Sequence, residues 1–163
     1  MCLIQNGKTR RPTSIVLIKF TNNLTQMKLT ISYSELHNYI AAHYHMNVSF
    51  TRVSDNEVCV SVTQKIFIKT IQVNLNLKVE EVSNESVLLI YNSGFGIDLI
   101  VSGLLTFVEK KLPEYGNLIS KQDGNRISLH LSKIEKLKEA FYMVELTGIR
   151  ILNDSIEVSC CLK

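Results

Sequence analysis

The sequence contains no tryptophan and no apolar run long enough to cross a membrane as a helix. The longest helical pattern, which starts at Ile97, is too short for a span and is interrupted by Asp98 and Glu109. An export signal is also missing, because the apolar run Ile15–Ile18 stops at Lys19, well short of the length that a signal peptide needs. These absences predict a cytoplasmic protein without a transmembrane segment.

Basic residues are not concentrated on any predicted helix. The net charge is +3 and the isoelectric point is about 8.6, a mild excess that is spread along the chain. Nucleic-acid-binding modules usually cluster basic residues with interleaved aromatics, whereas the comparable run here is short and consists of Lys8, Arg10 and Arg11. We therefore expect no nucleic-acid partner.

Catalytic and metal-site motifs are missing as well. Histidines that bind one metal ion on a helix stand four positions apart, but His37, His43 and His45 are six, two and eight positions apart. The pattern nominates no base for Cys59, and an enzyme would be indicated only if Cys59, His130 and an acid converged. We expect no catalytic residues, no metal and no cofactor, and hence a non-enzymatic protein.

The cysteines show no CxxC spacing, which favours a reducing compartment. They are Cys2, Cys59, Cys160 and Cys161. Adjacent Cys160 and Cys161 point to opposite faces of any strand. Cys160 falls in phase with the apolar residues around it, so we expect it to be a small core residue.

The composition is that of an ordinary globular protein, with 45% apolar and 20% charged residues. It predicts a single domain with its own core, which we place at residues 27–163, where Met27 opens a stretch that resembles a bacterial start. Residues 1–26 differ in character and are expected to be a poorly ordered extension. The alternative for this segment is an edge strand at Ile15–Phe20.

The strongest signal that is present is strand periodicity. Ile71–Glu80 alternates apolar and polar residues without a break, which predicts a strand with one buried face. Val58–Val62 alternates in the same way, and the phase slips by one residue at Lys69–Thr70. Because such a slip is typical of a β-bulge, we expect a long bent ribbon from Val58 to Val79.

A second signal is helical. Ile97–Leu112 follows a 3.6-residue period, and Pro113 prevents the helix from continuing. The apolar arc is about 160° wide at 100° per residue, so this helix needs cover from a sheet. We therefore predict an α+β fold in which a curved antiparallel sheet, a meander plus hairpins, wraps this long apolar helix.

Local signals predict the remaining elements. Capping-box spacing at Ser32–Glu35 predicts a shorter N-terminal helix through about His45, and the same spacing at Ser132–Glu135 predicts another short helix. Hairpin turns are predicted at Asp123-Gly124-Asn125 and at Asn153-Asp154.

The order of elements from Thr30 onward resembles the half-barrel of the tubular lipid-binding (TULIP-like) superfamily, in its small bacterial single-domain form. The matching pieces are the opening helix, the long ribbon, the enclosed helix and the closing hairpin, at Ser32–Ile40, Val58–Val79, Ile97–Leu112 and Gly148–Leu162. The resemblance implies a curved sheet around a long helix, with acyl chains held in the apolar space between them.

Two functions are compatible with this pattern. The first is non-enzymatic binding of a lipid or another apolar ligand between the sheet and the helix, through burial worth about 25 cal/mol per Å² of ligand surface. The expected lining residues are Val73, Leu75, Leu77, Leu104, Phe107 and Val108. The alternative is a structural or protein-interaction domain in which the same residues form a solid core without a ligand.

Overall fold

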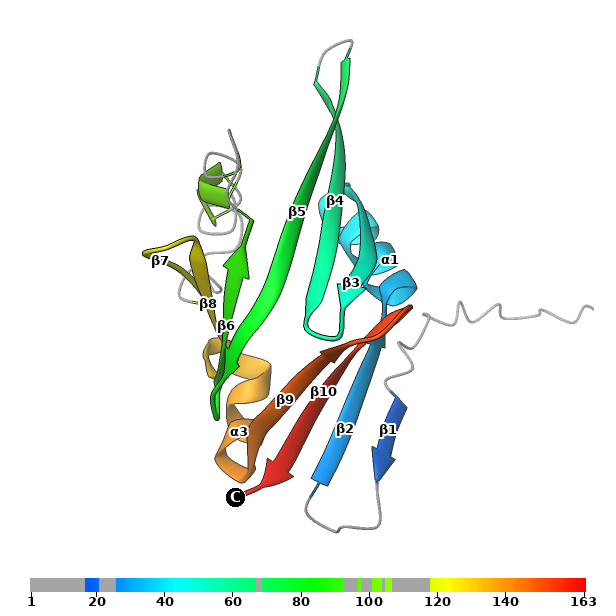
Figure 1. Cartoon of the computed structure of the whole chain (residues 1–163). Helices are drawn as coiled ribbons and strands as arrows, with labels where there is room; N and C mark the ends of the chain where they lie inside the picture. The colour runs from blue at the N-terminus through cyan, green and yellow to red at the C-terminus, as the bar shows by residue number, and fades with distance from the viewer. Residues whose placement is uncertain are drawn as a thin grey trace, which may run out of the picture.

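The computed structural model describes residues 17–20, 26–66, 69–92, 97, 101–103, 105–106 and 118–163. Over these residues the chain is mostly strand, and the strands form two antiparallel sheets (Figure 1). The elements are β1 (Leu17–Phe20), β2 (Gln26–Ser32), α1 (Tyr33–Tyr44), β3 (Asn47–Ser54), β4 (Glu57–Ile66), β5 (Lys69–Val82), β6 (Ser86–Tyr91), β7 (Ile119–Gln122), β8 (Arg126–His130), the 3-10 helix η2 (Leu131–Lys133), α3 (Glu135–Met143), β9 (Val144–Ile151) and β10 (Ser155–Leu162). The four-stranded sheet has the order β1-β2-β10-β9, and the six-stranded sheet has the order β3-β4-β5-β6-β8-β7.

The prediction of one curved sheet wrapping a long apolar helix was wrong. The strands divide into two sheets, and no long apolar helix is evident in the described part of the chain. Within Ile97–Leu112, residues 97, 101–103, 105 and 106 are described and helical, and the others lie outside the described residues. Val101 is 1% exposed, whereas Ser102 and Thr106 are exposed. The helical residues are therefore covered on one side and not surrounded.

The phase slip at Lys69–Thr70 is a reversal of the chain and not a β-bulge. β4 and β5 are separate antiparallel strands, and their register is continuous up to the pair Ile66–Lys69. An alternating pattern slips by one residue at a tight reversal just as it does at a bulge, so the sequence alone could not separate the two. The expected bent ribbon is thus a hairpin of two long neighbouring strands.

A β-bulge does occur in β5, between Val79 and Glu81, where this strand pairs with β6. Val79 pairs with Leu89 and Glu81 pairs with Leu88, so Glu80 has no counterpart on β6. Bulges of this kind change the direction in which a side chain points. This bulge determines the position of the Glu80 carboxylate.

The first capping box is confirmed, whereas the second is not formed, although the short helix that it predicted is present as α3. The Ser32 hydroxyl accepts from the Glu35 amide at 3.2 Å, and the Glu35 carboxylate accepts from the Ser32 amide at 2.9 Å. Helix α3, by contrast, starts after Ile134, which makes no side-chain cap. Ser132 lies instead within η2. The chain between β8 and α3 therefore enters the helix by a 3-10 turn.

Both predicted hairpins are confirmed. β7 and β8 are joined through Gly124 and Asn125, which have φ values of 73° and 58°. β9 and β10 pair around the turn at Asn153-Asp154. At the N-terminal side, Leu17–Phe20 forms the edge strand β1, paired with β2. The rest of residues 1–25 lies outside the described residues, so the extension stays a prediction.

The two faces of the six-stranded sheet differ in polarity. On one face Val58 lies opposite Leu77, and Leu77 lies opposite Tyr91. On the other face Ile90 has Lys78 on one side and Arg126 on the other. The first face packs into the interior, and the second carries most of the polar side chains of the sheet.

The two sheets are joined where the edge of one meets the turns of the other. The Leu146 amide of β9 donates to the Asn84 carbonyl at 2.9 Å, and the Ile151 amide donates to the Asp55 carbonyl at 2.7 Å. These carbonyls lie in the β5–β6 and β3–β4 turns, and Figure 1 shows β9 beside the β3–β4 turn. Since unpaired strand edges invite pairing with other chains, these turns protect β9.

A core shared by both sheets supports this joint. Val87 of β6, Phe141 of α3 and Leu146 of β9 form one buried cluster. Cys160 of β10 packs against it, and burial raises the pKa of its thiol. The prediction that Cys160 behaves as a small core residue is consistent with this position.

Candidate functional site

Leu75 and Leu77, two of the residues expected to line an apolar tunnel, lie in or beside a packed cluster. Leu75 is buried together with Tyr91, Val101 and Ile127, and Leu77 packs against this group. Val73 is half-buried on the same strand. Leu104, Phe107 and Val108 lie outside the described residues.

This cluster fills the contact between the sheet and the helical residues. Val101 and Tyr91 are each only 1% exposed, and they meet Leu75 from different elements. Ile97 and Leu105, one helical turn before and after Val101, add partly buried contacts. The described side chains therefore pack against one another around Leu75, and the expected ligand site stays a prediction.

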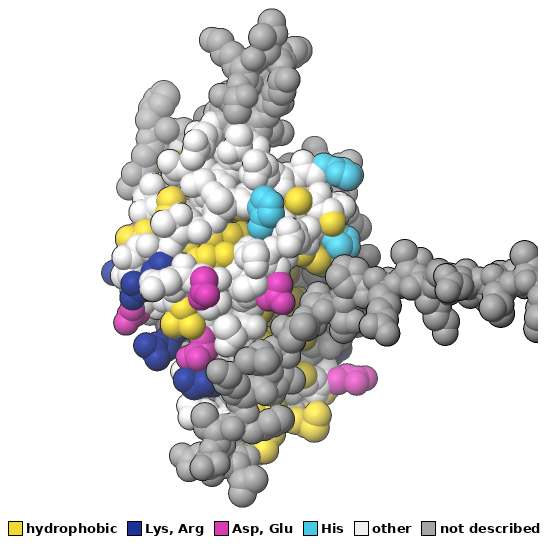
Figure 2. All heavy atoms as spheres, turned by 90° about the vertical axis from the view of Figure 1, so that its right-hand side faces the viewer, with side chains coloured by type: hydrophobic (Ala, Val, Ile, Leu, Met, Phe, Trp, Pro, Cys, Tyr) yellow, Lys and Arg dark blue, Asp and Glu magenta, His cyan; other side chains and the backbone are white. Residues whose placement is uncertain are grey.

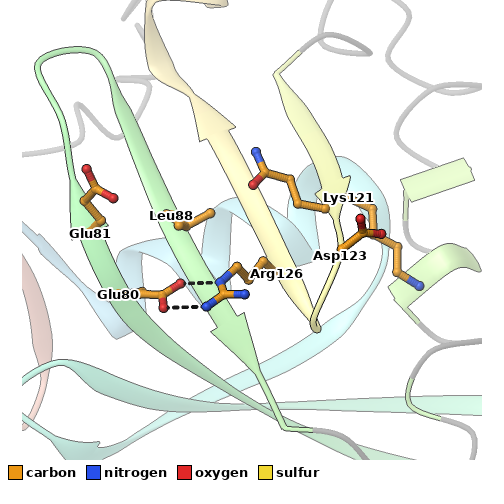
Figure 3. A pocket seen from close by; sticks show the side chains of 7 residues that line it. Glu80, Glu81, Leu88, Lys121, Asp123 and Arg126 are labelled. Atoms are coloured by element: carbon orange, nitrogen blue, oxygen red, sulfur yellow. Dashed lines mark hydrogen bonds and ion pairs between the residues drawn. The ribbon is translucent and has the colours of Figure 1, made fainter.

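An open polar hollow lies on the other face of the six-stranded sheet (Figure 3). Its volume is about 810 Å³. Its lining consists of Glu80, Glu81, Leu88, Lys121, Gln122, Asp123 and Arg126. The described residues of the expected apolar lining, Val73, Leu75 and Leu77, do not contribute to it, and such a polar lining is unlike that of a typical lipid site.

The hollow is built around an ion pair between Glu80 and Arg126. Arg126 donates from Nε and Nη2 to the two carboxylate oxygens at 2.6 and 2.9 Å, as the dashed lines in Figure 3 show. Gly124 keeps the hairpin turn open beside this side chain, since a Cβ there would lie 2.9 Å from Nη1 of Arg126. The guanidinium thus bonds to Glu80, and the missing side chain of Gly124 leaves room for it.

This ion pair makes Glu80 and Arg126 poor candidates for a general acid or base. The hydrogen bonds from Arg126 hold the pKa of Glu80 below its ordinary value, and the same contact raises the pKa of Arg126. A general acid or base works best with a pKa near the working pH. The pKa values of both groups are therefore shifted further away from neutral pH.

A second hollow, of about 590 Å³, lies between the β5–β6 turn and η2. Its lining consists of Ser83, Asn84, Glu85, Ser86, His130, Ser132 and Lys133. The hydroxyls of Ser83 and Ser86 are 2.6 Å apart, and the His130 ring lies 3.4 Å from the Ser120 hydroxyl. These contacts hold the turn and the strand ends in place.

The possible catalytic residues do not converge in the described structure. Cys59 is on β4 and His130 is on β8, with β5 and β6 between these strands. His37 and His43 each contact a backbone carbonyl, of Val48 and Tyr39 respectively. Among the described residues, no cluster of three or more His, Cys, Asp or Glu side chains has a geometry suited to a metal ion.

Side chains at one end of the molecule form an exposed apolar group. Tyr142 and Met143, at the end of α3, are 71% and 65% exposed, and Leu162, near the end of β10, is 48% exposed. The Lys163 amide donates to the Met143 carbonyl at 2.9 Å, which brings the two chain segments together. We call Tyr142, Met143 and Leu162 the α3-end surface. Figure 2 views the molecule from the side away from α3, and apolar side chains lie at the lower end of that face as well.

We did not predict the polar hollow or the α3-end surface from the sequence. Glu80 and Arg126 are 46 positions apart, so their contact depends on a strand order that no local pattern gives. Tyr142 and Met143 did carry a signal. They fall out of phase with Leu137 and Phe141, which lie four positions apart on one side of α3.

No protein-family model, no curated protein and no solved structure matches the chain. The resemblance to the TULIP-like superfamily stays a prediction. In the described part of the chain, no helix combines the length and the apolar character that a membrane crossing requires.

Proposed function

We propose that the chain is a non-enzymatic interaction domain that binds another protein through the α3-end surface. The observation that carries this proposal is the exposure of two consecutive large apolar residues, Tyr142 and Met143, beside Leu162. Single exposed apolar residues are common on proteins, but a contiguous group is typical of a binding surface. Tyrosine and methionine are also enriched in protein–protein interfaces.

The packing of the interior supports the same proposal. Leu75, Tyr91, Val101 and Ile127 form a buried cluster near the place where an apolar ligand was expected. The apolar side chains of this region therefore already have partners within the chain. The exposed large apolar side chains of the described residues include Tyr142, Met143 and Leu162 of the α3-end surface.

The rigidity of this end also suits a docking surface. Lys163 donates from Nζ to the Phe141 carbonyl at 2.7 Å and pairs with Glu85 at 3.5 Å. Phe141 itself is buried against Val87 and Leu146. Tyr142 and Met143 follow this anchor directly, so binding a partner orders little additional backbone.

Paired substitutions test the proposal. The Y142S/M143S variant removes the apolar side chains, and Y39S is the matched control because Tyr39 is a 54% exposed tyrosine on the separate helix α1. We expect both variants to fold, since exposed substitutions usually change stability by about 0.5 kcal/mol or less. In quantitative capture from the native cell extract, a specific protein should bind to the Y39S variant but not to the Y142S/M143S variant. Equal capture by both variants would contradict the proposal.

A second candidate function is binding of a lipid or another apolar ligand. Val73 and Leu77 are only half-buried, and this favours it. Native mass spectrometry of the purified protein and uptake of a fluorescent fatty acid distinguish the two functions. A stoichiometric lipid that is lost in a Val73→Asp variant would support this second function, and an empty protein that takes up no fatty acid would exclude it.

The proposal includes a cytoplasmic location. Cys59, Cys160 and Cys161 are free thiols, and thiols persist best in a reducing compartment. Fractionation of the native cells with an antibody against the protein tests this part. Recovery in an oxidising compartment would contradict it without affecting the interaction itself.

A further inference from the structure

We draw no further inference here: the strongest candidate, the hydroxyl- and imidazole-lined hollow between the β5–β6 turn and η2, carries nothing, because Ser83 and Ser86 bond to each other, His130 lies against Ser120, and in the described residues no buried polar side chain without a partner is aimed into it.

Discussion

Glu80 of β5 bonds to Arg126 of β8 across the intervening strand β6, with donor–acceptor distances of 2.6 and 2.9 Å. The contact depends on the bulge that leaves Glu80 without a counterpart on β6. It links β5 to β8 on the polar face of the sheet and spans β6 between them. Because the pair is partly exposed, its effect should depend on pH and on salt.

We expect Glu80→Gln to lower the melting temperature at neutral pH but not in acid. Arg126 holds the pKa of Glu80 below its ordinary value. Such a carboxyl stabilises the fold above its unfolded pKa, and this contribution is lost as the pH falls through the lower, folded pKa. Melting curves at pH 7 and well below the ordinary glutamate pKa of about 4.3 check this. Glu81→Gln is the control, and a difference that persists unchanged in acid would contradict the prediction.

Because Leu75 lies in a buried cluster, we expect a large loss of stability when its side chain is shortened. Leu75→Ala leaves a cavity against Tyr91 and Val101 and should cost about 2–5 kcal/mol in the free energy of unfolding. Leu162→Ala, at an exposed position, should cost about 0.5 kcal/mol or less. Urea denaturation measures both values. A similar small cost for the two variants would mean that Leu75 borders open space.

The two capping-box sequences predict opposite results for the same substitution. Ser32→Ala removes the hydroxyl that accepts from the Glu35 amide, and should cost about 1 kcal/mol. Ser132→Ala should change stability by about 0.5 kcal/mol or less, because α3 has no side-chain cap. Thermal unfolding of both variants checks the difference. An equal loss of stability in both variants would indicate that Ser132 also caps a helix, and would contradict the prediction.

The contact of Tyr33 with the β9–β10 turn should also contribute to stability. Its hydroxyl donates to the Leu152 carbonyl at 2.9 Å, so Tyr33→Phe should cost about 0.5–1.5 kcal/mol. Burial raises the pKa of Tyr33, so the stabilisation is present at neutral pH and is lost as the pH rises through the folded pKa. Urea denaturation at pH 7 gives the cost, with Tyr142→Phe as the exposed control. No difference between these two variants would contradict the prediction.

The parts of the fold that the sequence predicted depend on local chemistry. The α1 cap needs only Ser32 and Glu35, and the β7–β8 turn needs Gly124 and Asn125 at positive φ. Both signals act within four residues. The turn residues and the capping serine were therefore readable before any strand order was known.

The parts that were wrong or missed depend on pairing between distant strands. The slip at Lys69–Thr70 has the same appearance for a bulge and for a reversal, and only the Ile66–Lys69 pair decides between them. The apolar residues that start at Ile97 indicated that one side of a helix is buried, but not whether its other sides are covered as well. The contact of Glu80 with Arg126 requires both the strand order and the bulge.

The most direct test of the proposed function is photo-crosslinking from the α3-end surface. A photoreactive phenylalanine analogue is incorporated at position 142 or, as the control, at position 39 on α1, and the protein is irradiated in its native cells. The account predicts a crosslinked partner protein from position 142 and none from position 39. A lipid adduct, no adduct, or the same adducts from both positions would contradict it.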